Sequence, residues 1–503
     1  MPAALDPVPQ PLDHLALSGA DGAPALVLRG ETLSWQDLRT RVARLAAWLQ
    51  AQVPEPGARV ANWGAKGELT CVLPLAAARA GLVHVPINPL LKRAQVAHIL
   101  GDSGASLLIA TEARLATLEP GDLPDGCQAI GEEEASGRIA ACSGRLPPSS
   151  ADPGELAAIL YTSGSTGLPK GVMLSHANLW LGAVSVAHYL GLEADDVVLG
   201  VLPLSFDYGQ NQLLSAWRAG ACVVPLDYLT ARDGIKACQR HGVTTLAAVP
   251  PLWVQLVEQD WPAEAVAPMR RLTNSGGALT PELVRRLRTI FPHAALFPMY
   301  GLTEAFRSTY LDPALVDAHP TSMGRAIPFA EILVVGDGGE EAAPGEEGEL
   351  VHCGPLVAQG YWRDPARTAE RFRPAPEFSR CGGVAVWSGD RVKRDGEGLL
   401  HFVGRRDGMI KSAGNRISPQ EIEDAALATG LASEVAAFGV RDARLGQAIH
   451  LVVRGTGDEA GLRAALKREL PGFMQPHAIR WVERMPLNPN GKIDRVALQA
   501  QVA

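Results

Sequence analysis

Residues 159–174 read ILYTSGSTGLPKGVML, a short apolar run followed by a loop rich in glycine and hydroxyl groups. The loop carries hydroxyls at Thr162, Ser163, Ser165 and Thr166, glycines at Gly164 and Gly167, and a lysine at Lys170. Glycines let backbone N–H groups approach a ligand, hydroxyls add donors, and a lysine supplies positive charge. Apolar segments on both sides favour a loop between two strands over a flexible linker. The stretch therefore predicts a phosphate-binding loop.

Two better-known motifs do not fit this loop. The nucleotide P-loop, G-x-x-x-x-G-K-[ST], places its lysine directly after the last glycine, whereas Lys170 follows Leu168 and Pro169. The nucleophile elbow, G-x-S-x-G, needs a glycine two residues before the serine, and Ser163 stands there before Ser165. The spacing therefore disfavours both a P-loop NTPase and a serine hydrolase.

Strand and helix patterns alternate on both sides of the loop, which predicts an α/β fold with parallel sheets. Residues 113–153 are rich in Pro, Gly, Asp and Ser and predict a surface connection. From about residue 326 to 404, short strands split by glycine-rich turns predict a small β subdomain. We therefore expect a large N-terminal domain over residues 1–406 and a small, mobile α+β C-terminal domain over residues 407–503.

Composition narrows the class of protein further. The chain has 503 residues and a net charge of −8, which argues against a nucleic-acid-binding surface. Its seven cysteines are scattered without a C-x-x-C pair, so neither a disulfide framework nor a zinc site is indicated. The first residues lack a signal-peptide pattern, and no apolar run approaches the length of about 18 residues needed to span a membrane. We expect a cytoplasmic protein without a membrane span.

Three further motifs suggest a nucleotide site. NSGGAL, residues 274–279, has two adjacent glycines that would let backbone lie flat against an aromatic base, although it also suits a plain strand-to-helix turn. MYGLTEAF, residues 299–306, follows a predicted strand, and ligands of open α/β sheets bind at such strand ends. WSGDRV, residues 387–392, supplies Asp390, whose carboxylate could accept from ribose hydroxyls or could simply be exposed in a turn.

The stretch YTSGSTGLPKGVMLSHANL resembles the signature loop of the AMP-forming adenylating enzymes, which include acyl-CoA synthetases, peptide-synthetase adenylation domains and luciferases. The three motifs above, then GRRDGMIKSAGNRISPQEIE and PLNPNGKIDR, occur in that family's order. The combination of SFDYGQNQ with YGLTEAFRSTYL looks closest to stand-alone acyl-CoA ligases associated with exosortase systems. The resemblance implies that an acid attacks Mg·ATP to give acyl-AMP and pyrophosphate, after which a thiol displaces AMP.

The resemblance also assigns roles to individual residues. Tyr300 would flank the adenine, and Asp390 and Arg405 would contact the ribose. Thr303 would contact phosphate, and Glu304 would hold the Mg²⁺ that bridges the ATP phosphates, as suits a hard cation. The implied ATP/AMP-binding set is Thr162, Ser163, Gly164, Ser165, Thr166, Gly167, Lys170, Gly276, Gly277, Ala278, Tyr300, Gly301, Asp390 and Arg405.

Lys492 would have the central catalytic role. A carboxylate and an α-phosphate repel each other, and a lysine bridging both would offset that repulsion in the transition state. By resemblance, Asp407 is the hinge about which the C-terminal domain turns, and Lys411 and Gly414 then line the thiol-entry side. Asn415 departs from the family pattern, because many relatives carry tyrosine there.

The segment LPLSFDYGQNQ, residues 202–212, bears on the choice of acid. Asp207 could pair with a substrate amino group, as in amino-acid adenylation domains, or could cap a helix starting at Tyr208. Arg307 is unexpected in an apolar pocket and could pair with Glu304 or bind a second polar group. The pocket positions carried over by motif are Asp207, Tyr208, Asn211, Thr273, Ser275, Met299, Arg307 and Ser308.

The expected function is therefore an AMP-forming acid–thiol ligase that uses ATP, Mg²⁺ and CoA. The first alternative is an amino-acid adenylating ligase that loads the phosphopantetheine of a carrier protein. A luciferase-like oxygenase would share only the adenylation half. A non-catalytic adenylate-binding protein would normally lack Lys492 or Glu304, and both are present.

Overall fold

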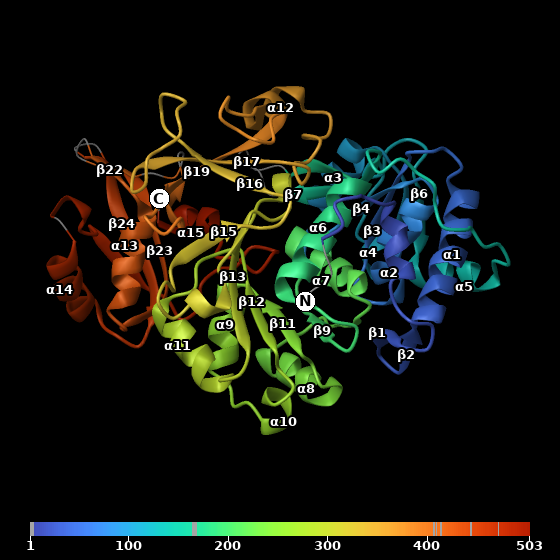
Figure 1. Cartoon of the computed structure of the whole chain (residues 1–503), viewed down its shortest axis with the longest axis horizontal. Helices are drawn as coiled ribbons and strands as arrows, with labels where there is room; N and C mark the ends of the chain where they lie inside the picture. The colour runs from blue at the N-terminus through green and yellow to red at the C-terminus, as the bar shows by residue number, and fades with distance from the viewer. Residues whose placement is uncertain are drawn as a thin grey trace.

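The computed structural model describes residues 5–162, 169–405, 408, 410–412, 415–442, 445–470 and 472–502. Within these residues the strands form three sheets, of six, fourteen and five strands. The predicted α/β class is confirmed, with the two larger sheets in the N-terminal part and the smallest in the C-terminal part (Figure 1). Among the helices described, none has the length and apolarity that a membrane crossing requires.

The six-stranded sheet has the order β6-β5-β3-β4-β7-β8. Its strands are β3 (Arg59–Trp63), β4 (Val83–Pro86), β5 (Ala105–Ala110), β6 (Gln128–Gly131), β7 (Leu156–Thr162) and β8 (Lys170–Ser175). All neighbours are parallel except β7 and β8, which are antiparallel, with Thr162 opposite Lys170. The predicted strand–loop–strand arrangement around the opening motif is confirmed in its strands.

The prediction of a surface connection over residues 113–153 is wrong for the middle of that range. Strand β6 and helix α5 (Glu132–Ala141) lie within that range, and β6 pairs in parallel with β5 at the edge of the sheet. Because half of β6 is exposed, this edge strand has no apolar run from which the sequence could reveal it.

The fourteen-stranded sheet has the order β16-β17-β19-β20-β15-β14-β13-β12-β11-β9-β10-β1-β2, with β18 paired to β19. The end nearer the N-terminus comprises β1 (Pro24–Leu28), β2 (Glu31–Ser34), β9 (Val197–Gly200), β10 (Cys222–Pro225), β11 (Thr245–Ala248), β12 (Arg271–Asn274) and β13 (Ala295–Tyr300). The other end comprises β14 (Thr309–Tyr310), β15 (Ser322–Ala326), β16 (Glu331–Val335), β17 (Glu347–Cys353), β18 (Phe372–Pro374), β19 (Val384–Arg394) and β20 (Leu400–Arg405). Pairing is parallel from β1 to β13 and antiparallel from β13 to β20.

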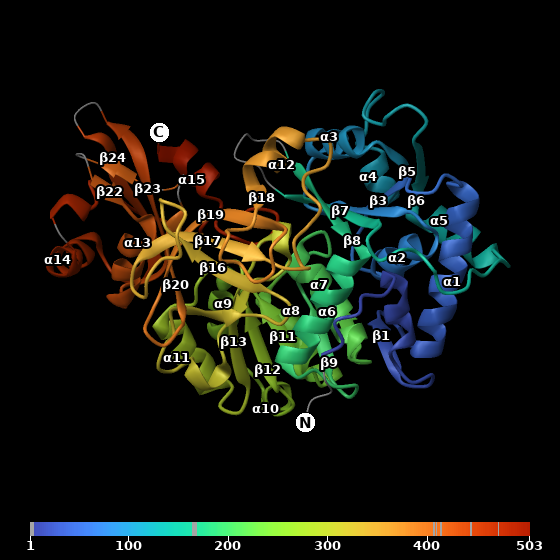
Figure 2. The same ribbon diagram turned by 45° about the horizontal axis from the view of Figure 1, so that its top comes forward.

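Helices α6 (His176–Leu190) and α7 (Asp207–Arg218) lie between the two larger sheets, as Figures 1 and 2 both show. The helix α6 begins with a capping box in which Ser175 accepts from the backbone of Asn178. The remaining helices of this part are η1 (Leu12–Leu17), α1 (Trp35–Gln52), α2 (Glu68–Arg79), α3 (Arg93–Ser103), α4 (Glu112–Leu115), α8 (Ala231–His241), α9 (Pro250–Val257), α10 (Ala263–Val266), α11 (Pro281–Ile290), η2 (Thr303–Ala305), η3 (Pro313–Leu315) and α12 (Pro365–Arg371).

The C-terminal part has a sheet and core of its own. Its elements are β21 (Ile410–Ser412), β22 (Asn415–Ile417), α13 (Pro419–Ala428), β23 (Ala432–Asp442), β24 (Gly446–Gly455), α14 (Glu459–Glu469), η4 (Gly472–Met474), β25 (Ala478–Trp481) and α15 (Arg495–Val502). A cluster around Ile422, Leu451 and Leu466 forms its main core, built from residues of this part alone. Its contacts with the rest of the chain include an ion pair of 3.2 Å between Arg454 and Glu258.

Candidate active site

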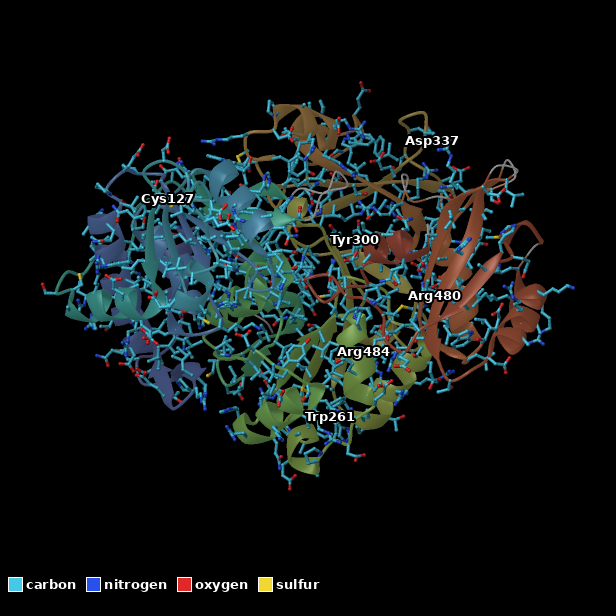
Figure 3. The ribbon with its side chains drawn as sticks, turned by 180° about the vertical axis from the view of Figure 1, so that it is seen from behind. Cys127, Trp261, Tyr300, Asp337, Arg480 and Arg484 are labelled. Atoms are coloured by element: carbon cyan, nitrogen blue, oxygen red, sulfur yellow. The ribbon has the colours of Figure 1, made fainter. Side chains whose placement is uncertain are left out.

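The predicted site residues gather where the carboxyl ends of the parallel strands meet the C-terminal part. Tyr300 ends β13, and Thr303 and Glu304 follow at once in η2. Figure 3 shows Tyr300 near the centre of the molecule, close to the boundary between the two parts. This placement follows the general rule that open α/β sheets bind ligands beyond the carboxyl ends of their strands.

Lys170, Glu304 and Tyr361 form a compact triangle on the phosphate side. The Lys170 Nζ lies 3.0 Å from Glu304 Oε1 and 2.7 Å from the Tyr361 hydroxyl, which itself donates to Glu304 Oε1 over 2.7 Å. Burial raises the pKa of the Glu304 carboxyl, but Lys170 and Tyr361 outweigh that effect, so the pKa is lowered overall. Glu304 is therefore an ionised carboxylate whose charge is held in place by two donors.

This corner suits the magnesium of an ATP complex. The Thr162 hydroxyl at the end of β7 is buried and has no hydrogen-bond partner among the described residues. One carboxylate together with hydroxyl oxygens is the kind of donor set that Mg²⁺ takes from a protein when phosphates supply the rest. No cluster of three or more acidic, histidine or cysteine side chains that could hold a metal occurs in the described part of the chain. The remaining loop positions, Ser163, Gly164, Ser165, Thr166 and Gly167, lie outside the described residues.

Tyr300, Asp390 and Arg405 come together on the nucleoside side. Asp390 on β19 and Arg405 on β20 are opposite each other in register, and the Arg405 Nε lies 3.0 Å from Asp390 Oδ1. The Tyr300 hydroxyl donates to Asp390 Oδ2 over 2.5 Å. Asp390 is only 5% exposed, so the alternative of an exposed turn aspartate is wrong. The three residues that the resemblance assigns to the nucleoside therefore form one contact group.

Lys492 reaches this site from the C-terminal part. Its Nζ lies 4.8 Å from the centre of the Phe206 ring, within cation–π range. Its side chain also covers Gly276, where an added Cβ would come within 2.6 Å of Lys492 Cε. Gly276 has a φ of 82°, so a side chain there would be strained as well as blocked. Gly276 thus makes room for the lysine, whereas Gly277 lies against Pro250, and Gly276, Gly277 and Ala278 form an exposed turn.

A tight turn positions Lys492. The Asn488 side chain accepts from the backbone N–H of Asn490 at 3.0 Å and of Lys492 at 3.1 Å. The N-terminal part also contacts this turn, because Asn88 Nδ2 donates to Pro489 O at 2.9 Å. Lys492 is therefore held at the site by contacts from both parts of the chain.

The charge on Lys492 predicts a pH effect. Burial lowers the pKa of its ammonium, Arg307 and Arg405 act in the same direction, and Asp207 and Glu304 oppose them. Because the protonated form supplies the charge, acid-dependent ATP–pyrophosphate exchange should fall as pH rises through this lowered pKa, below the usual value for a lysine. In Lys492→Arg the fall should move to higher pH, since a guanidinium stays charged. If wild-type and Lys492→Arg proteins lost exchange activity over the same alkaline pH range, this prediction would be wrong.

The acyl pocket lies against helix α7, which is polar in sequence and yet almost wholly buried. Tyr208, Asn211, Gln212 and Ser215 share the helix face that lines an enclosed cavity of about 20 Å³. The Tyr208 hydroxyl is 2.7 Å from Thr273 Oγ1 on β12, and both residues line the cavity. Polar residues on a buried face are expected where a ligand binds, because packing alone would favour apolar ones.

Asp207 does not have the capping role that its position suggested. Helix α7 begins at Asp207 itself, its N-cap is Phe206, and no side chain caps it. The Asp207 carboxylate instead accepts from Thr303 Oγ1 over 3.1 Å. Burial raises its pKa, although Arg307 and Lys492 pull it down. Asp207 therefore connects helix α7 to η2, the short helix that carries Thr303 and Glu304.

Arg307 also departs from the simplest expectation. Glu304 contacts Lys170 and Tyr361, whereas Arg307 Nη1 donates to Ser275 Oγ over 2.9 Å. The intervening Phe306 has a φ of 62°, unusual for a side chain of that size. This backbone reversal lets neighbouring residues face opposite ways, with Glu304 toward the phosphate side and Arg307 toward the acyl pocket.

The other predicted positions divide into those at the cavity and those away from it. Met299 lines the cavity, whereas the Ser308 hydroxyl lies 2.9 Å from His352 Nδ1 on β17 and away from the cavity. Gly301 packs against the backbone of residues 306 and 307. Lys411 lies in strand β21, of whose side chains the structure describes only some, and Asp407 and Gly414 lie outside the described residues.

Among the residues at the site that were not predicted are Phe206, Gln212, Ser215 and Tyr361. Gln212 and Ser215 could have been found from helical periodicity, because they follow Tyr208 and Asn211 by four residues. Phe206 and Tyr361 had no comparable signal, since their partners lie far away in the sequence.

Two family models match the chain: AMP-binding enzyme over residues 15–362, and AMP-binding enzyme C-terminal domain over residues 421–492. The chain belongs to the AMP-binding enzyme family. A feruloyl-CoA synthase of Amycolatopsis sp is 31% identical over 92% of this chain and 93% of that protein. An L-proline–[L-prolyl-carrier protein] ligase of Pseudomonas fluorescens is 30% identical, covering 95% and 96%. The structure of ATP-bound MatB from Rhodopseudomonas palustris superposes with a TM-score of 0.88 at 26% identity, covering 98% and 99%.

This AMP-binding enzyme is an AMP-forming acid–thiol ligase of the acyl-CoA ligase type, and it uses ATP, Mg²⁺ and a thiol, either CoA or the phosphopantetheine of a carrier protein. Relatives that load an amino acid onto a carrier protein are about as similar to it as the CoA ligases are. Overall sequence similarity therefore does not identify the acid. The identity of the acid depends on the pocket residues of this AMP-binding enzyme.

Proposed function

We propose that the enzyme joins a small carboxylic acid to CoA, with Lys492 catalysing the first half of the reaction. The observation that carries this proposal is the position of Lys492 over Gly276 and Phe206. From there its ammonium can lie between the acid and the α-phosphate. The acid oxygen attacks the α-phosphorus, the bond to the β-phosphate oxygen breaks, and pyrophosphate leaves with those electrons. The developing negative charge is offset by Lys492.

The remaining contacts support a division of the ATP molecule between two groups of residues. Tyr300, Asp390 and Arg405 would bind the nucleoside, with Asp390 accepting from ribose hydroxyls. Thr162, Lys170 and Glu304 would bind the departing phosphates and their magnesium, which would offset the charge of the phosphates. Lys170 would then exchange its contact with Glu304 for one with phosphate.

The second half of the reaction, in which the thioester forms, requires Lys492 to leave the site. We propose that residues 407–503 turn as a unit about Asp407, so that the segment with Lys411 and Gly414 replaces Lys492 at the site. The separate core of this part supports such a motion. The CoA sulfur would attack the acyl carbonyl carbon, and AMP would leave. We also place the reaction in the cytoplasm, since the seven cysteines form no disulfide in the structure.

The proposal is tested with purified protein and a broad panel of fatty, aryl and amino acids. At least one acid should stimulate ATP–pyrophosphate exchange, and CoA should then yield its thioester and AMP. CoA should react faster than pantetheine. An enzyme that takes free CoA can also bind its nucleotide part, which pantetheine lacks. A protein that exchanges pyrophosphate with none of these acids would contradict the function, and equal use of pantetheine would favour a carrier-bound thiol.

A further inference from the structure

Arg307 is buried in the acyl pocket without an ion-pair partner among the described residues. It is 2% exposed, its Nη1 donates to Ser275, and its guanidinium lies 4.5 Å from the centre of the Tyr208 ring. Its Nε has no acceptor in that part of the chain. A buried guanidinium without a paired carboxylate is unfavourable, so its partner is expected to come from a ligand.

The two nearby carboxylates are already engaged. Glu304 is held by Lys170 and Tyr361, and Asp207 accepts from Thr303. Asp207 attracts Arg307, but the two form no ion pair among the described residues. Arg307 is therefore a pocket cation without an ion-paired carboxylate in the described part of the chain.

On these grounds we propose that the acid activated by this enzyme carries a second carboxylate, which Arg307 binds in the acyl pocket. This inference rests on the proposed function and specifies its substrate class. The first carboxylate reacts beside Lys492, and the second lies at the far end of a short chain. A planar guanidinium with a free Nε suits a carboxylate, because it can donate two parallel hydrogen bonds.

Other unpartnered polar groups line the same cavity. Asn211 Nδ2, both polar atoms of the Gln212 amide and Thr245 Oγ1 are buried and have no hydrogen-bond partner among the described residues. Buried polar atoms are normally satisfied, so several in one cavity indicate a missing polar ligand. The cavity is small, at about 20 Å³, which favours an acid with a short chain.

The same contacts argue against an amino acid with an apolar side chain. Its ammonium could reach Asp207 only close to the cations Arg307 and Lys492, which act on that same carboxylate. Its side chain would leave the guanidinium and the cavity amides unpaired. A dicarboxylic acid satisfies these groups without disturbing Asp207.

The test compares acids of matched length in the wild-type enzyme by ATP–pyrophosphate exchange. Succinate, glutarate and adipate are measured against butyrate, valerate and hexanoate, with glutaramate as the neutral amide of glutarate and L-norvaline as the amino acid. The best dicarboxylate should exceed its matched monocarboxylate in kcat/KM by about 10- to 100-fold, the range expected for hydrogen bonds to a charged group. The difference should lie mainly in KM.

Arg307→Met should reduce that preference toward unity, and Arg307→Lys should retain part of it. Arg218→Met is the matched control, because Arg218 lies at the other end of α7, 5.7 Å from the centre of the Trp180 ring and outside the cavity. This control should keep the wild-type preference. If Arg307→Met does not fold, stabilisation of the wild-type protein against heat by glutarate, and not by glutaramate, supports the proposal.

Monocarboxylates or L-norvaline used as well as or better than every dicarboxylate would overturn the inference and leave the ligase function intact. An unaltered preference in folded Arg307→Met would also overturn it. Failure of the function itself is distinct, since it requires that no acid of the broad panel supports exchange.

Discussion

Lys492→Ala is expected to lower acid-dependent ATP–pyrophosphate exchange by about 10²- to 10³-fold, as is typical when one preorganised group is removed from a developing charge. The lysine is held at the site by the Asn488 turn and by Asn88, so its loss removes a positioned charge and leaves the turn in place. Thiolysis of supplied acyl-AMP should be spared, because that half of the reaction is assigned to the other pose of the C-terminal part. Exchange and CoA-dependent AMP release, measured on the same preparation, give the two rates.

Lys467→Ala provides the matched control for this experiment. Lys467 is an exposed lysine on α14, which lies at the outer edge of the same C-terminal part (Figure 1), and we assign it no role in the reaction. Its replacement should change neither half of the reaction. An equal loss of both halves in Lys492→Ala would refute the division of labour between the two poses.

Glu304→Gln should reduce exchange by about 100-fold or more and raise the Mg²⁺ concentration needed for half-maximal rate. The substitution keeps the shape of the side chain but removes a charge that Lys170 and Tyr361 hold in its ionised form. The amide is a much weaker ligand for magnesium, and it leaves Lys170 without its ion-pair partner. Exchange rates over a range of Mg²⁺ concentrations measure both effects.

Tyr361→Phe separates the charge of Glu304 from its positioning. It removes one hydroxyl donor and keeps the carboxylate, so its effect should be about fivefold, as expected for a hydrogen bond worth about 1 kcal/mol. A Glu304→Gln enzyme with the wild-type rate and magnesium dependence would show that the metal is held elsewhere.

Much of the fold could be predicted because its signals are local. The alternation of strands and helices, and the strands around residues 163–169, follow from apolar runs and turn residues within short windows. Strand β6 escaped prediction because an exposed edge strand lacks an apolar run. The capping role considered for Asp207 was wrong because its carboxylate has a distant partner, Thr303.

The sequence by itself determined the class of reaction, because the motifs around Thr162, Glu304 and Lys492 are contiguous and occur in the family's order. Only the tertiary structure decided how the charges are paired. Lys170 meets Glu304 across 134 positions of the chain, whereas Arg307 remains buried with Ser275 and no carboxylate among the described residues. Local sequence cannot encode such pairings, because the backbone reversal at Phe306 and the packing of distant strands set which side chains face each other. The loop of residues 159–174 thus identifies the adenylating chemistry, and the fold around Arg307 indicates which acid it serves.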